Sequence, residues 1–198
     1  YHHFSREPGG VMNPRVCTGP VCALKGSQAL LEELAGEGAC SMPCAGRCDD
    51  PIPVLRGHGG YAGLHADGLK AHLSPLPPPP AEGVEECVFA HIRRRSRAGI
   101  LGYRRSGGYG GLRKALAMSP QELIRSLEVS GLNGRGGAGF PTWRKWQAVR
   151  DAPGDPKTIV CNADEGEPGC FKDRAIMDHD PHAVLEGMLL AGYATGAP

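Results

Sequence analysis

SGLNGRGGAGFPTWRKW, residues 130–146, sets the architecture that we expect for the rest of the chain. Its glycine-rich loop runs from Gly134 to Gly139 and leads into an expected helix that carries Lys145. Glycine lets the backbone bend through positive φ and approach a ligand closely. The amides of such a loop, together with the N-terminus of the following helix, form a site for a phosphate anion. Arg135 and Lys145 add positive charge at the two ends of this loop.

A second stretch, TIVCNADEGEPGCFKDR at residues 158–174, supplies acidic side chains. The short apolar run Thr158-Ile159-Val160 is bounded by turn residues and predicts a buried strand. Polar groups at the carboxyl end of a strand in an α/β sheet lie where ligands bind. The residues expected there are Asn162, Asp164, Glu165 and Glu167.

The glycine loop alone is open to a second interpretation, a flexible linker. The acidic stretch after Val160 argues against a linker, which needs no such partner. An ordinary Rossmann fingerprint is rejected, because the loop does not follow a clear strand.

Together the two stretches resemble the flavin- and NADH-binding subunit of respiratory complex I, a module shared with NAD-dependent formate dehydrogenases and bidirectional NAD-linked hydrogenases. The resemblance covers residues 119–198 and implies an FMN that lies along the glycine loop, with NADH stacked on it. It implies roles on the FMN phosphate side for Gly134, Arg135, Gly136 and Lys145, and contacts to the rest of FMN for Asn162, Asp164 and Glu165. It places Gly137, Phe140 and Glu167 against the dinucleotide.

Eight cysteines are present among 198 residues, and five of them fall between Cys17 and Cys48. Such clustering beside a cofactor-type loop indicates metal or redox chemistry in a reducing cytoplasm rather than a secreted disulfide framework. Thiolates suit both iron–sulfur clusters and zinc, and the spacings C-x4-C and C-x3-C favour a [2Fe–2S] cluster over a zinc knuckle or unligated thiols.

The loop Cys44-Ala-Gly-Arg-Cys48-Asp resembles that of thioredoxin-like [2Fe–2S] ferredoxins, which neighbour the flavin module in the same families. With this resemblance we assign four ligands: Cys17, Cys22, Cys44 and Cys48. The pair Cys40/Cys44 competes with Cys44/Cys48, and Gly46 between the latter two favours them because it allows a tight wrap.

The expected fold class is therefore α/β, with a thioredoxin-like ferredoxin domain joined to an incomplete Rossmann-like FMN/NADH-binding domain. We expect the first domain at 1–73, truncated at its N-terminus, a Pro-rich linker at 74–83, and the flavin domain at 84–198, truncated at its C-terminus. Residues 52–55 predict a short edge strand, because Pro53 lacks a backbone donor. Residues 56–73, with three histidines seven residues apart, are interpreted as a solvated loop with a short helix, and His2-His3 as a frayed end.

Three helix signals stand in the second half. Ser119-Pro120 with Glu122 is a capping box with proline at the first helical position, and Gly131 predicts the end of that helix. Asp180-Pro181 begins the last helix, whose apolar stripe is interpreted as core packing. That stripe consists of Val184, Leu185, Met188 and Leu189.

The expected function is electron transfer between NAD(H) and iron–sulfur clusters through FMN, with the cofactor doing the chemistry. No catalytic residue is therefore named. NAD-dependent formate dehydrogenase is the parent complex expected first, with complex I or NAD-linked hydrogenase as alternatives, and a zinc-binding interaction module as the alternative of another class. We expect partner subunits, a [4Fe–4S] cluster only beyond residue 198, and little NADH oxidation by the fragment alone. A net charge of +1 and the lack of an apolar run of about 20 residues argue against nucleic-acid binding and membrane insertion.

Overall fold

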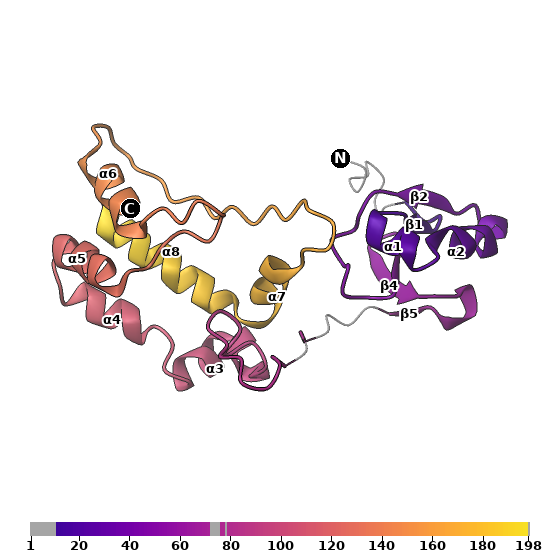
Figure 1. Ribbon diagram of the computed structural model, residues 1–198, viewed down its shortest axis with the longest axis horizontal. Coiled ribbons are helices and arrows are strands. Elements are labelled where there is room, and N and C mark those ends of the chain that lie inside the picture. The colour runs from indigo at the N-terminus through magenta and orange to yellow at the C-terminus, as the bar shows by residue number, and fades with distance from the viewer. Residues whose placement is uncertain (1–10, 72–75, 78, 198) are drawn as a thin grey trace. The chain divides into compact units, whose positions relative to one another are not determined.

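The computed structural model describes residues 11–71, 76–77 and 79–197 (Figure 1). The chain divides into two compact units. The first contains residues 1–78 together with 163–175, and the second contains residues 79–162 and 176–198. The return of residues 163–175 to the first unit is a feature that the expected linear order of two domains did not include. His2-His3, His72 and part of the expected linker lie outside the described residues.

A five-stranded mixed sheet in the order β2-β1-β3-β4-β5 forms the first unit. The strands β1 and β2 are parallel, and the other pairs are antiparallel. Parallel strands need a crossover connection, and two helices and a 3-10 turn provide it here. The elements in chain order are β1 (Arg15–Cys17), α1 (Pro20–Leu24), α2 (Ser27–Glu33), η1 (Ala35–Glu37), β2 (Cys40–Met42), β3 (Ile52–Arg56), β4 (Gly59–Gly63), η2 (Ala66–Gly68) and β5 (Lys70–Ala71).

A single apolar core lies between α2 and this sheet. Leu30 and Leu34 from the helical segment are fully buried against Val16, Ile52 and Val54 from the two central strands. The buried thiols of Cys17 and Cys22 belong to the same cluster of side chains. This core therefore fixes the end of β1 and the start of α1, from which the first two cysteines project.

The predicted strand at residues 52–55 is present as β3, but its expected edge position is wrong. β3 is the middle strand of the five, between β1 and β4. Pro53 is tolerated because β1 pairs with β3 only at Val54 and Leu55, so no neighbour on that side requires a donor from Pro53. The solvated loop expected at residues 56–73 is also wrong, since this segment supplies β4 and β5.

Helices make up the regular structure of the second unit. They are η3 (Arg95–Ala98), α3 (Ile100–Arg105), α4 (Gly110–Leu116), α5 (Pro120–Ser130), α6 (Thr142–Asp151) and α8 (Pro181–Thr195), while α7 (Lys172–His179) crosses the division between the units. The helices α4, α5 and α6 all pack against α8. The predicted capping box is confirmed, because Ser119 accepts from the Glu122 amide and Glu122 accepts from the Ser119 amide. Gly131 ends α5 in the left-handed conformation, as predicted.

A buried polar network holds α8 to the segment before α4. Arg97 and Asp180 are 6% and 5% exposed and form an ion pair at 2.9 Å. Glu186 accepts hydrogen bonds from the Tyr103 hydroxyl at 2.5 Å and from the Tyr109 amide at 2.8 Å. Burial works against the charge of Glu186, but these hydrogen bonds hold its pKa below the usual value. Burial, reinforced by Glu186, raises the pKa of Tyr103.

The buried strand predicted at Thr158–Val160 is absent. Residues 157–162 have no regular secondary structure, and the side chain of Val160 is 80% exposed. A strand needs a neighbour for its backbone hydrogen bonds, and the described part of the second unit contains only an isolated bridge between Asn133 and Pro141. The apolar stripe of α8 is likewise only partly covered, since Leu185 and Leu189 are 46% and 51% exposed. The α/β class is confirmed, with every strand of the described residues in the first unit.

Candidate functional site

Four cysteines gather as two pairs at one end of the β1–β2 ladder. Cys17 is the last residue of β1 and Cys22 lies in α1, and both are 1% exposed. Cys44 and Cys48 lie in the loop that follows β2, and their sulfur atoms are 3.6 Å apart. Neither pair forms a disulfide. The segment from Cys17 to Cys22, with its loop at Thr18 and Gly19, and the loop after β2 therefore present four free thiols from the two segments that the sequence indicated.

Gly19 allows these two loops to lie against each other. A Cβ atom at Gly19 would lie 3.0 Å from the Cβ of Cys44 and 3.2 Å from its Cα, closer than packed carbon atoms normally approach. The backbone amide of Thr18 also donates to the carbonyl of Met42 at 3.0 Å, which extends the contact between the loops. The spacing between the cysteine pairs thus depends on the absence of a Cβ atom at Gly19.

We expect Gly19→Ala to destabilise the loop contact by about 1–3 kcal/mol, the range for overpacking a close contact. Hydrogen exchange of residues 11–24, followed by mass spectrometry, measures this as faster exchange in the β1 region. Gly36→Ala is the matched control, because a Cβ atom at Gly36 would meet nothing within 4 Å. Equal exchange in Gly19→Ala and the unsubstituted chain would contradict the close packing of the two loops.

The thiols share electrostatic interactions as well as position. Burial, the hydrogen bond with Cys17 and the charge of Cys17 raise the pKa of Cys22 to about 12, and Cys48 acts in the same direction. Burial also raises the pKa of Cys48, with a further contribution from the Cys44 thiol, while the Gly169 amide opposes the shift. Without a metal, Cys22 and Cys48 are therefore neutral thiols at pH 7. Metal binding would have to release their protons.

Cys40 lies away from the other four sulfurs. In the parallel register Arg15 pairs with Cys40 and Cys17 pairs with Met42, so Cys40 is two residues further back along the ladder than Cys17. Two residues of strand correspond to about 6.6 Å. Cys40 is also exposed, whereas Cys44 and Cys48 are partly buried. This position favours Cys44/Cys48 as the second pair.

The described residues contain no group of three or more His, Cys, Asp or Glu side chains that converges to hold a single ion. The three remaining cysteines lie outside these pairs: Cys87, Cys161 and Cys170.

The glycine loop is closed at its base and open to solvent at its tip. The amide of Gly134 donates to the carbonyl of Phe140 at 2.8 Å, and the amide of Thr142 donates to the carbonyl of Leu132 at 3.0 Å. Cβ atoms at Gly136 and Gly137 would meet nothing within 4 Å. Lys145 lies in the first turn of α6, the helix predicted from the sequence, and its side chain is exposed.

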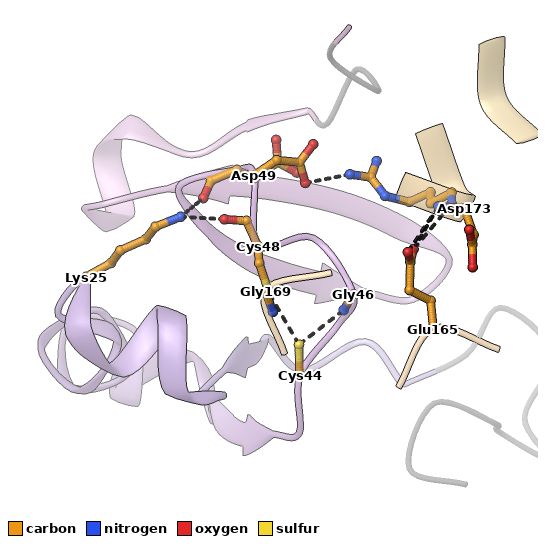
Figure 2. A network of polar contacts seen from close by, with 10 residues as sticks. Lys25, Cys44, Gly46, Cys48, Asp49, Glu165, Gly169 and Asp173 are labelled. Atoms are coloured by element: carbon orange, nitrogen blue, oxygen red, sulfur yellow. Dashed lines mark hydrogen bonds and ion pairs between the residues drawn. The ribbon is translucent and has the colours of Figure 1, made fainter. Parts of the chain in front are cut away.

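The acidic stretch is used in an unexpected way. Glu165 accepts hydrogen bonds from the amides of Asp173, at 3.0 Å, and Arg174, at 3.3 Å, and so caps the N-terminus of α7 (Figure 2). Lys172 donates to the same carboxylate at 3.1 Å. Burial opposes the charge, but the hydrogen bonds lower the pKa of Glu165. Glu167 is exposed.

The predicted flavin residues are divided between the two units. The glycine loop, Lys145 and Asn162 belong to the second unit, whereas Asp164, Glu165 and Glu167 belong to the first. Their joint role therefore stays a prediction. Sequence reasoning missed the contacts that Gly169, Asp49 and Arg174 make beside the cysteine loop. No sequence signal could have found them, because the partners lie more than 120 positions apart in the chain.

The comparisons with known proteins agree with these motifs. Residues 127–198 match the family described as Nuo51 FMN-binding domain. An NADH-quinone oxidoreductase subunit of Rhizobium meliloti (strain 1021) is 55% identical over 96 residues, which cover 48% of this chain and 23% of that protein. The NAD-reducing hydrogenase HoxS subunit alpha of Cupriavidus necator (strain H16) is 32% identical over 225 aligned residues, which cover 99% of this chain and 37% of that protein.

A solved structure of an NAD+-reducing [NiFe]-hydrogenase in the air-oxidized state shares the fold. Its TM-score is 0.67 at 23% identity, over 100% of this chain and 38% of that chain. The chain thus spans about a quarter to two fifths of the length of the relatives named here. None of the described helices is long and apolar enough to cross a membrane. The glycine loop and the acidic stretch both lie within residues 127–198, the part of the chain that matches the Nuo51 FMN-binding domain.

Proposed function

We propose that the chain is part of a diaphorase module, which transfers electrons between NAD(H) and iron–sulfur clusters through FMN. The observation that carries this proposal is the closed glycine loop directly before α6, within the region that matches the FMN-binding domain. Both relatives, an NADH-quinone oxidoreductase and an NAD-reducing hydrogenase, are named for a reaction with a nicotinamide dinucleotide. FMN would supply the two-electron exchange with NAD(H) and the one-electron exchange with clusters.

The residues of the glycine loop fit a flavin phosphate. Pro141, the N-cap residue of α6, provides no side-chain hydrogen bond to the helix, so the first turn of α6 keeps donors for an anion. Within the part of the chain that the structure describes, the side chains of Arg135 and Lys145 form no ion pair or hydrogen bond. Their charges are therefore available to a phosphate. We assign Gly134, Arg135, Gly136 and Lys145 to this role.

The remaining assignments follow the family motif. Asn162, Asp164 and Glu165 would contact the rest of FMN. Gly137, Phe140 and Glu167 would face the dinucleotide, and Phe140 is 46% exposed, which leaves its ring accessible for such a contact. For Glu165 this role requires that its carboxylate leaves the N-terminus of α7, or that an oxygen already accepting hydrogen bonds there also contacts the ligand. These chain residues would bind and orient the flavin, and none of them needs to act as a proton donor or acceptor.

Cys17, Cys22, Cys44 and Cys48 fit a [2Fe–2S] cluster. They form two pairs of free thiols at one end of a ladder, with Cys22 and Cys48 in electrostatic contact across the pairs. The donor set is all sulfur, which suits iron–sulfur clusters. We propose that the cluster exchanges single electrons with the flavin side of the module.

The parent complex is proposed to be of the NAD-linked hydrogenase type. The alignment with the hydrogenase relative covers 99% of this chain, the cysteine-rich half included, whereas the alignment with the quinone oxidoreductase relative covers 48% of it. Partner subunits would then carry the site at which the second substrate reacts. A formate dehydrogenase parent, the first expectation from the sequence, stays a prediction, as does a cytoplasmic location.

Lys145→Ala tests the flavin site. We expect the variant to bind FMN more weakly by about 1.5–3 kcal/mol, because hydrogen bonds to charged groups contribute that much. Isothermal calorimetry or quenching of flavin fluorescence gives the affinity. Riboflavin lacks the phosphate and should bind both proteins equally, and Lys114→Ala, on α4, serves as the charge-matched control. Equal loss of FMN and riboflavin binding would place Lys145 away from the phosphate.

A further inference from the structure

Residues 163–175 fold back onto the loop that carries Cys44 and Cys48, within the first unit. The backbone amide of Gly169 donates to the sulfur of Cys48 at 3.0 Å. Beside it, the carboxylate of Asp49, labelled in Figure 2, forms an ion pair with Arg174. The side chains of Arg174 and Asp49 are only 18% and 16% exposed. A segment far along the chain thus meets the cysteine loop through a donor to sulfur and through a neighbouring ion pair.

Both sides of this contact are fixed by further interactions. On one side, Glu165 caps α7 and so holds the segment in a closed turn that ends at Arg174. On the other side, the ammonium group of Lys25 donates to the carbonyls of Cys48, at 3.0 Å, and Asp50. The backbone of Gly169 has φ of +97°, a conformation that favours glycine. The amide of Gly169 is therefore held toward Cys48 rather than meeting it by chance.

We propose that Gly169 is a positioning residue that tunes the reduction potential of the cluster bound at Cys48, and that the Asp49–Arg174 ion pair holds it in place. This inference rests on the proposed function, because it requires a cluster at Cys48. It goes beyond that function by assigning the control of the cluster's potential to residues outside the ligand set.

The direction of the effect follows from charge. Reduction adds one negative charge to the cluster and its thiolates. A hydrogen bond to a ligand sulfur is stronger when the sulfur carries more negative charge, so it stabilises the reduced form more than the oxidised form. Hydrogen bonds to the sulfurs are among the factors that set iron–sulfur potentials. Loss of the Gly169 contact should therefore make the potential more negative.

The same segment contains Asp164, Glu165 and Glu167, which we assign to the flavin and the dinucleotide. In the first unit these acidic residues and the Cys48 contact belong to one continuous turn. A displacement of the turn would therefore move the donor to the cluster sulfur. The geometry therefore links the binding of flavin or dinucleotide at the acidic turn to the reduction potential of the cluster.

A redox titration of the reconstituted 198-residue chain, followed by electron paramagnetic resonance, tests the ion pair. Arg174→Gln and Asp49→Asn should each lower the ratio of reduced to oxidised cluster at a fixed potential by about tenfold, which corresponds to about 59 mV for a one-electron couple. The double variant should show little further change, because either single change removes the same contact. Lys172→Gln is the control, since Lys172 is exposed and its ion pairs among the described residues are with Glu165 and Asp173.

Isotope labelling tests the Gly169 contact directly. With [15N]glycine in the chain, pulsed electron paramagnetic resonance of the reduced cluster should detect nitrogen coupling from Gly169 and, more weakly, from Gly46, whose amide lies 3.4 Å from the Cys44 sulfur. Gly169→Ala should remove the larger coupling, since that position then carries no label. Gly166→Ala should leave both couplings unchanged.

The outcomes separate the inference from the function on which it rests. A cluster with an unaltered potential in Arg174→Gln and Asp49→Asn, or with unaltered couplings in Gly169→Ala, would overturn the role of Gly169 and leave the cluster assignment intact. Absence of any cluster from the unsubstituted chain would overturn both. A lower potential together with the lost coupling would establish the tuning contact.

Discussion

Serine in place of Cys17, Cys22, Cys44 or Cys48 is expected to abolish the [2Fe–2S] cluster of the reconstituted chain, whereas Cys40→Ser should leave it intact. Four sulfurs are needed, and the two pairs supply them from the β1–α1 segment and from the loop after β2. Cys40 lies two residues back along the β1–β2 ladder from Cys17 and is exposed. This is the largest effect that we expect, because a missing ligand opens the coordination of one iron.

Visible absorbance, iron content per chain and the spectrum of the dithionite-reduced protein measure the loss. Cys87→Ser is a matched control, since Cys87 is an exposed cysteine of the other unit. Loss of the cluster in Cys40→Ser together with its survival in Cys48→Ser would show that the second pair is Cys40/Cys44. A colourless protein that binds zinc at the same four thiols would instead support the interaction module.

Asp180→Ala is expected to destabilise the second unit by about 3–5 kcal/mol, the cost of leaving one partner of a buried ion pair uncompensated. Arg97 donates to Asp180 through Nε at 3.0 Å and through a terminal nitrogen at 2.9 Å. The guanidinium of Arg97 also lies 4.4 Å from the centre of the Tyr103 ring. Removal of the carboxylate would leave this buried cation without its counter-charge.

Urea unfolding followed by tryptophan fluorescence measures the effect on this unit alone. The chain has two tryptophans, Trp143 and Trp146, and both lie in α6. Glu128→Ala, at an exposed site on α5, should change the free energy of unfolding by less than about 0.5 kcal/mol. The double variant Arg97→Ala/Asp180→Ala should lose less than the sum of the single losses. Additive losses would show that the two side chains do not interact.

Local signals predicted the helices of the second unit well. The ends of α5 follow from Ser119, Glu122 and Gly131, whose side-chain and backbone preferences act within one turn of the helix. The helix that carries Lys145, which was expected directly after the glycine loop, is present as α6.

Features that depend on distant partners could not be predicted. The middle position of β3 depends on where β1 and β4 pair with it, which no residue near Pro53 encodes. The missing strand at Thr158–Val160 shows the same limit. An apolar run forms a strand only where a second strand lies beside it and shares its backbone hydrogen bonds. For the candidate site, sequence reasoning gathered the four cysteines but not the role of Glu165 as a cap for α7.

Cys48 and Gly169 are separated by 121 positions in the sequence, and this separation has a consequence for synthesis on the ribosome. The sheet of the first unit uses residues 15–71 and can form as soon as they emerge. At about 5–20 residues per second, Gly169 follows Cys48 by about 6–24 s. During this interval the cysteine loop has its own sheet but lacks its distant donor. Iron delivered to the nascent chain would thus meet the four thiols before the Gly169 amide reaches Cys48.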